Sequence, residues 1–125
     1  MYKVGHATTN EGRQGKVTLT DQDLVLDMME TTPEDLFAAA YAACYYSALN
    51  GVKAARNIEC EHRVKVTVGV DETQAAKPLY VKIQVAFDGL DRQTAERLAQ
   101  YGDQVCRYST AVEGNIKKEV ELIKY

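Results

Sequence analysis

The sequence lacks the features that mark several common classes of protein. It has only three cysteines and no C-x-x-C pair, and both histidines lie far from Cys44 and Cys106 in sequence. This argues against a zinc site and against a secreted disulfide framework, so we expect no metal. Lysine and arginine are scattered and the net charge is -3. Nothing therefore favours nucleic acid or an anionic membrane surface as a partner.

Targeting and membrane-spanning segments are missing as well. The first residues contain no apolar stretch of the kind that signal peptides carry. The longest uncharged run, Leu36 to Val52, has 17 residues and is rich in alanine and tyrosine. It is too short for a confident membrane span. We therefore expect a cytoplasmic protein with no membrane partner, folded as a single domain over residues 1–125.

Hydrophobic periodicity predicts an α+β fold with the element order β-β-β-α-β-β-α-β. The expected architecture is an antiparallel sheet with a long central apolar helix and a second helix. The second and third strands should form a hairpin, since turn residues separate them. Strands are expected over residues 2–9, 16–20, 24–28, 59–70, 79–87 and 116–124.

The central helix has a clear predicted start. Thr32 suits the N-cap position, Pro33 the first helical position, and the helix should run to about Arg56. Its surface is apolar on nearly every side, which is typical of a helix that is buried all round. A chain of this length can hardly surround such a helix, so a second chain should supply part of the cover. Asp91 is expected to cap the second helix, which delivers Cys106 near its end.

The cysteines admit two interpretations on their own. A cysteine in an apolar helix, such as Cys44, is more often a small core residue than a nucleophile. Cys60 falls on the inward phase of a predicted strand and is expected to be structural. Cys106 stands beside Arg107 at a helix end, where partial exposure is expected. The residues alone therefore leave open whether any thiol reacts.

Three segments resemble signatures of the OsmC/Ohr family, the osmotically inducible and organic hydroperoxide resistance proteins. "PEDLFAAAYAAC", "CRYSTAVEGN" and "GRQG" follow the family patterns in the expected order along the chain. The matching positions are Gly12, Arg13, Gly15, Pro33, Glu34, Leu36, Phe37, Ala38, Ala39, Tyr41, Cys44, Cys106, Tyr108, Ser109, Ala111, Gly114 and Asn115.

The resemblance implies an intertwined homodimer that reduces organic hydroperoxides to alcohols with two cysteines. Cys44 would be the peroxidatic cysteine and Cys106 the resolving one, joined in a disulfide after turnover. Arg13 and Glu34 fall on the family's activating arginine and its carboxylate partner. No bound cofactor is implied. The reductant would be an external dithiol, of lipoyl type by resemblance, carried by a protein or by a small thiol.

The chemistry explains why an arginine is needed. A thiolate attacks peroxide and a thiol does not, whereas burial of Cys44 disfavours the anion. Lowering its pKa to about 6 requires about 3.4 kcal/mol, and a full charge about 4 Å away supplies about 4 kcal/mol at an effective dielectric of 20. Glu34 and Cys44 lie about 15 Å apart along a continuous helix. Either the helix begins after Glu34, or a partner chain brings Arg13 and Glu34 to Cys44.

Phe37, Tyr41 and Tyr45 are candidates for an apolar pocket that favours alkyl hydroperoxides over hydrogen peroxide. Arg107 replaces the proline that usually follows the second cysteine in the family. Its charge either lowers the pKa of Cys106 or faces water. Two alternatives to the peroxidase remain: a non-catalytic, stress-related ligand-binding member of the fold, and a thiol redox sensor whose disulfide signals without turnover.

Overall fold

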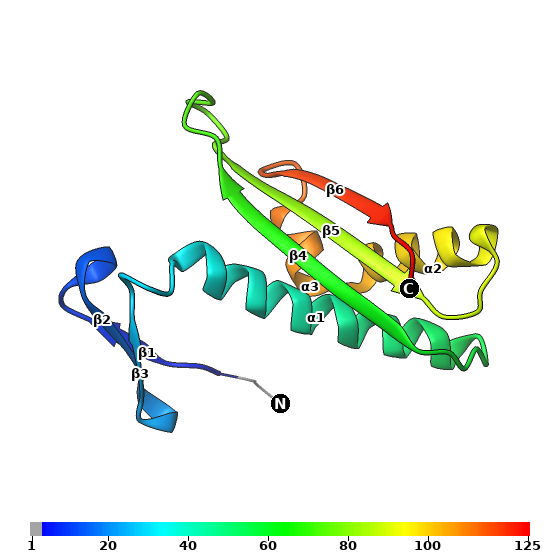
Figure 1. Ribbon diagram of the computed structural model, residues 1–125, viewed down its shortest axis with the longest axis horizontal. Coiled ribbons are helices and arrows are strands. Elements are labelled where there is room, and N and C mark those ends of the chain that lie inside the picture. Colours follow the sequence, from blue (N-terminus) through cyan, green and yellow to red (C-terminus); the bar gives the residue numbers. More distant parts are fainter. Residues whose placement is uncertain (1–3) are drawn as a thin grey trace. The chain divides into compact units, whose positions relative to one another are not determined.

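The computed structural model describes residues 4–125 and has the α+β architecture that the sequence predicts (Figure 1). The chain divides into an N-terminal unit that ends at Leu36 and a C-terminal unit, Phe37–Tyr125. Each unit contains one three-stranded sheet. Each is described by itself below.

The N-terminal unit is a small antiparallel sheet in the strand order β1-β2-β3. Its strands are β1 (Ala7–Thr9), β2 (Lys16–Leu19) and β3 (Leu24–Asp27). The predicted hairpin is confirmed, since β2 pairs with β3 along its whole length. The first strand is shorter than expected, and residues 2 and 3 of its predicted range lie outside the described residues.

Helix α1 (Pro33–Ala55) begins and ends almost where the sequence predicts. At its N-terminus the Thr32 hydroxyl accepts from the Asp35 N–H at 3.1 Å. The Asp35 carboxylate accepts in return from the Thr32 N–H at 3.0 Å. This reciprocal pair is a capping box, and it fixes the first turn. The idea that the helix starts only after Glu34 is therefore wrong.

The C-terminal unit contains the second sheet, in the order β4-β5-β6 (Figure 1). Its strands are β4 (His62–Val70), β5 (Leu79–Phe87) and β6 (Lys117–Leu122). The β4–β5 pair is antiparallel, whereas β5 and β6 are parallel. A parallel pair needs a crossover connection. Helices α2 (Arg92–Val105) and α3 (Arg107–Val112) form that connection. Strand β4 starts later than predicted, so Cys60 lies just before the sheet.

The core of this unit lies between β5, α1 and α2. Alternate residues of β5 face the helices. One stripe of α1 residues at helical spacing faces these β5 residues. The helices approach closely at Gly102, where an added Cβ would lie 2.7 Å from the Leu49 side chain. Buried members of this core are Tyr41, Tyr45, Leu49, Val52, Val81, Ile83, Val85, Phe87, Ala95, Leu98, Ala99 and Cys106.

The predicted cap of the second helix is confirmed. Asp91 accepts from the Thr94 N–H at 3.1 Å and fixes the start of α2. Helix α2 ends at Val105, so Cys106 stands between α2 and α3 and serves as the boundary residue of both. Within residues 4–125, no helix has both the length and the apolar character to cross a membrane.

Candidate active site

The C-terminal unit brings two cysteines into contact that are 62 residues apart in sequence. Cys44 lies in the middle of α1, and Cys106 lies at the junction of α2 and α3. The Cys106 thiol donates to the Cys44 sulfur across 3.2 Å. Both are free thiols in this structure. The sequence suggested partial exposure for Cys106, but that residue is only 1% exposed because α2 ends against the core.

The two sulfurs lie close enough for direct chemistry between them. A disulfide bond is about 2.05 Å long, so the sulfurs need to approach by only about 1 Å from their present separation of 3.2 Å. Cys44 is half-buried and Cys106 is buried. An external reactant therefore has easier access to the Cys44 sulfur than to its neighbour.

The pKa values of the two thiols move in opposite directions. Burial raises the pKa of Cys44, but hydrogen bonds from the Tyr108 N–H, the Cys106 thiol and the Arg107 N–H, together with the Arg107 charge, bring it below its usual value. Burial raises the pKa of Cys106, against hydrogen bonds from Ser109, and its bond to Cys44 holds the proton further. The site therefore favours a thiolate at Cys44 beside a protonated Cys106.

A buried polar residue, Ser109, interacts with Cys106. Ser109 and Tyr41 are both fully buried, and their oxygens lie 2.6 Å apart. Hydrogen bonding from Ser109 also lowers the pKa of Cys106 against the larger effect of burial. The sequence placed Ser109 within the family motif, but it gave no role to this residue. Its burial depends on how α3 packs onto α1, which no local pattern reveals.

Arg13 and Glu34 form the predicted pair. The two terminal guanidinium nitrogens of Arg13 donate to the two carboxylate oxygens of Glu34 at 3.1 Å, in a bidentate arrangement. The hydrogen bond to Arg13 lowers the pKa of Glu34. The Arg13 side chain is 60% exposed and its carboxylate partner 24%. This pair belongs to the N-terminal unit and the cysteine pair to the C-terminal unit.

The three aromatic residues predicted to line a pocket differ in their surroundings. Tyr41 and Tyr45 are fully buried core residues. The Tyr45 hydroxyl donates to the Ala99 carbonyl at 2.7 Å, and burial raises the pKa of Tyr45 well above its usual value, so it stays neutral. Phe37 is only partly buried and packs on Tyr41, with 5.9 Å between the ring centroids. Of the three, only Phe37 retains a partly open surface.

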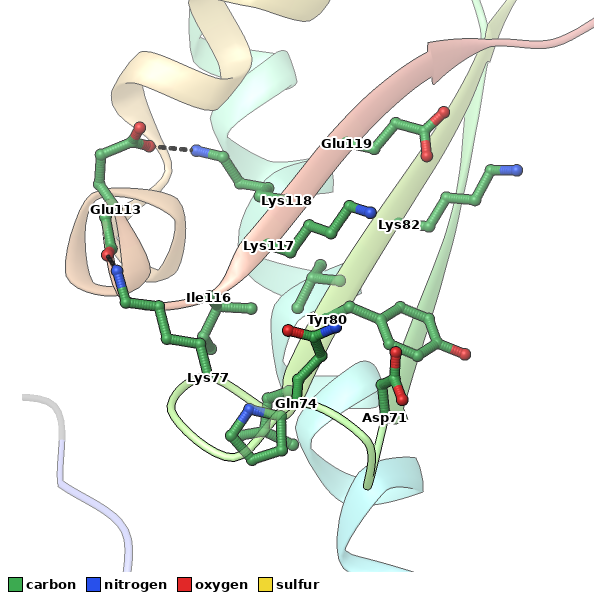
Figure 2. Close-up of a pocket in the computed structure, with 14 residues that line it drawn as sticks. Asp71, Gln74, Lys77, Tyr80, Lys82, Glu113, Ile116, Lys117, Lys118 and Glu119 are labelled. Carbon is green, nitrogen blue, oxygen red and sulfur yellow. Dashed lines mark hydrogen bonds and ion pairs between the residues drawn. The ribbon is translucent and has the colours of Figure 1, made fainter.

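An open groove of about 780 Å³ lies elsewhere in the C-terminal unit and contains none of the predicted site residues (Figure 2). Lysines and carboxylates line it together. Lys118 contacts Glu113 at 2.6 Å, and Lys77 donates to the Gly114 carbonyl at 2.6 Å. Because no cysteine lines it, the groove is not the candidate active site.

Comparison with known proteins gives consistent matches over nearly the whole chain. The family described as "OsmC-like protein" matches residues 26–121. The organic hydroperoxide resistance protein OhrA of Bacillus subtilis is 36% identical over 89% of this chain and 89% of its own length. The organic hydroperoxide resistance protein of Xanthomonas axonopodis pv. citri is 32% identical over 94% and 92%.

Solved structures agree with these matches. The crystal structure of the organic hydroperoxide resistance protein OhrB of Bacillus subtilis superimposes with a TM-score of 0.83 at 32% identity, covering 97% of this chain and 98% of that one. An organic hydroperoxide resistance protein from Elizabethkingia anophelis gives a TM-score of 0.87 at 29% identity and covers 100% and 99%.

Proposed function

Because the chain belongs to the OsmC-like family, as its signature segments suggested, we propose that it is a thiol-dependent peroxidase that reduces organic hydroperoxides to alcohols. The observation that supports this most directly is the 3.2 Å separation of the Cys44 and Cys106 sulfurs. The names of its relatives, organic hydroperoxide resistance proteins, point to the same class of substrate.

The proposed reaction uses both thiols in turn. The Cys44 thiolate attacks one oxygen of the peroxide bond, which breaks, and the alkoxide takes a proton and leaves as the alcohol. Cys44 is then a sulfenic acid. The Cys106 sulfur attacks it, water leaves, and a Cys44–Cys106 disulfide forms. An external dithiol, of lipoyl type in our proposal, gives two electrons and two protons to restore both thiols.

The opposite pKa directions suit this division of roles. Nucleophilic attack requires a thiolate, and the Cys44 environment favours that form. Cys106 is protonated before the attack and hidden from solvent. The Cys106 thiol can attack once a sulfenic acid forms on the neighbouring Cys44. The reverse assignment would require the buried thiol of higher pKa to meet the peroxide first.

Arg13 and Glu34 have a separate proposed role. Glu34 forms a bidentate ion pair with the Arg13 guanidinium. This pair fixes the orientation of the planar cation, as a group that faces the substrate requires. Glu34 and Cys44 share the unbroken helix α1, and ten residues of helix correspond to about 15 Å. We therefore propose that the Arg13–Glu34 pair of one chain serves Cys44 of a partner chain.

A homodimer would also cover an unusual face of α1. Opposite its buried stripe, the helix exposes a row of small or uncharged side chains instead of the charged ones expected in water. The exposed residues are Ala39, Ala40, Ala43, Tyr46, Ser47, Asn50, Gly51 and Ala54. A second copy packed on this face explains the absence of charge there. Light scattering should then give twice the mass of one chain, and Ala43→Glu should reduce the measured mass to that of a single chain.

The deciding experiment is intact mass spectrometry after one equivalent of cumene hydroperoxide. We expect the loss of two hydrogens and a Cys44–Cys106 peptide after digestion. Cys60→Ser, the matched control, should behave like the native chain. Cys106→Ser should stop at a sulfenic acid on Cys44. A chain that loses no hydrogens, or pairs Cys44 with Cys60 instead, would contradict the proposal. Repeated turnover with a dithiol separates a peroxidase from a redox sensor.

A further inference from the structure

Two side-chain hydrogen bonds join α1 to the segment that carries Cys106. Among residues 4–125, the bonds between α1 and this segment are the Cys106–Cys44 contact at 3.2 Å and a contact between the Tyr41 and Ser109 hydroxyls at 2.6 Å. All four residues belong to the C-terminal unit. Thiols are weak donors and weak acceptors. The hydroxyl pair is therefore the stronger of the two connections.

The two contacts have the same spacing on both sides. Tyr41 precedes Cys44 by three residues within α1, whereas Ser109 follows Cys106 by three residues. Helix side chains three residues apart are neighbours on one face. The side chain at an N-cap, here Cys106, likewise faces the side chain three residues later. The hydroxyl pair therefore lies one helical turn from the sulfur pair and connects the same two elements.

Burial makes the hydroxyl pair selective for one placement of α3 on α1. Tyr41 and Ser109 are both 0% exposed. A shift of α3 that separated their oxygens would leave two buried polar groups unsatisfied, which costs more than the loss of an exposed hydrogen bond. The Tyr41 ring also packs edge-on against Tyr108 of α3, with 6.2 Å between the centroids. Removing only the Tyr41 hydroxyl would keep this ring contact.

We propose that Tyr41 and Ser109 are positioning residues that hold Cys106 within reach of Cys44 for disulfide formation. The inference rests on the proposed function, in which the Cys106 sulfur attacks the sulfenic sulfur of Cys44. The S–S bond forms as the S–O bond breaks, and the hydroxide leaves as water with the thiol proton. The hydroxyl pair takes no part in this exchange. It acts through Cys106, by limiting how far that sulfur moves from its partner.

The test measures disulfide formation without any peroxide. The full chain is equilibrated with reduced and oxidised dithiothreitol, and the oxidised form takes up the two electrons and two protons that the thiols release. Mass spectrometry of the Cys44–Cys106 peptide gives the equilibrium constant for disulfide formation. We expect Tyr41→Phe and Ser109→Ala each to lower this constant about three- to tenfold, the fold-change that corresponds to one buried hydrogen bond.

Tyr45→Phe is the matched control. Tyr45 is equally buried on α1, but its hydroxyl donates to the Ala99 carbonyl of α2 at 2.7 Å. This variant should lose stability in urea, as Tyr41→Phe does, and keep the native equilibrium constant. The double variant Tyr41→Phe/Ser109→Ala leaves neither hydroxyl unpaired, so it should recover part of the stability. Its equilibrium constant should stay as low as in the single variants, whereas a merely structural role would move both quantities together.

The outcomes separate this inference from the peroxidase itself. Native equilibrium constants in both single variants would overturn the positioning role, and so would an equally low constant in Tyr45→Phe or full recovery in the double variant. If Tyr41→Phe does not fold, Ser109→Ala decides. The expected constants in a chain whose Cys44 is not oxidised by cumene hydroperoxide would refute the peroxidase and leave the positioning role standing.

Discussion

Oxidation of the cysteine pair should stabilise the folded chain substantially. Cys44 and Cys106 are separated by 62 residues, and closing a loop of this length in the unfolded chain costs about 4 kcal/mol of entropy. The two sulfurs already lie 3.2 Å apart, so bond formation demands little rearrangement of α1 against α2. Most of the loop-closure term should therefore appear as added stability of the disulfide form.

Urea unfolding of matched oxidised and reduced samples measures this effect. With a slope of about 1.5 kcal/mol/M, the oxidised chain should unfold at a midpoint about 2 M higher, with a shallower slope because its unfolded state is more compact. Protein concentration must be equal in both samples, since a dimer would make the midpoint depend on it. Cys60→Ser keeps the pair and should show the same difference, whereas Cys106→Ser should show none.

An oxidised chain no more stable than the reduced one would refute the reasoning. It would mean that bringing the sulfurs from contact to bonding distance strains the junction between α2 and α3 by as much as the cross-link gains. The contact between the thiols would then be a feature of packing only. A stabilisation of 2 kcal/mol or more would indicate a junction that accommodates both states.

Three further substitutions probe the supporting structure. Gly102→Ala should destabilise the chain by about 1–3 kcal/mol in urea, because its Cβ meets the α1 side chains at 2.7 Å. Tyr41→Phe should cost about 1–3 kcal/mol by leaving Ser109 without its buried partner, and adding Ser109→Ala should recover part of that loss. Glu34→Gln should slow peroxide reduction about tenfold by freeing the Arg13 fork, while Glu30→Gln leaves the rate unchanged.

The sequence predicted most of the fold because its signals are local. The capping pattern around Pro33 and the strict alternation over Leu79–Phe87 each depend on a few neighbouring residues, and both elements begin where expected. The prediction of an antiparallel sheet holds for β4 and β5 but is wrong for β6, which pairs with β5 in parallel. The direction of β6 depends on the path of the chain through α2 and α3. Alternation within a strand contains no information about the direction of the neighbouring strand.

The candidate site was predicted less evenly. The two thiols were identified through motifs, but the burial of Cys106 was not foreseen, because a residue at a helix end is buried or exposed according to what packs there. Arg107 was expected to act on Cys106 or to face water. Its charge instead contributes to the lowered pKa of Cys44, whose sulfur lies 3.2 Å from that of Cys106.

The surroundings of Cys44 change what Arg13 has to do in the proposed reaction. From the sequence alone, a single arginine had to offset the desolvation of Cys44 and lower its pKa as well, with little free energy to spare. In the structure, hydrogen bonds from the α3 backbone and the nearby charge already hold the pKa of Cys44 below its ordinary value. The Arg13–Glu34 pair then need not create the thiolate. We propose that the pair instead stabilises negative charge on the peroxide oxygens as their bond breaks.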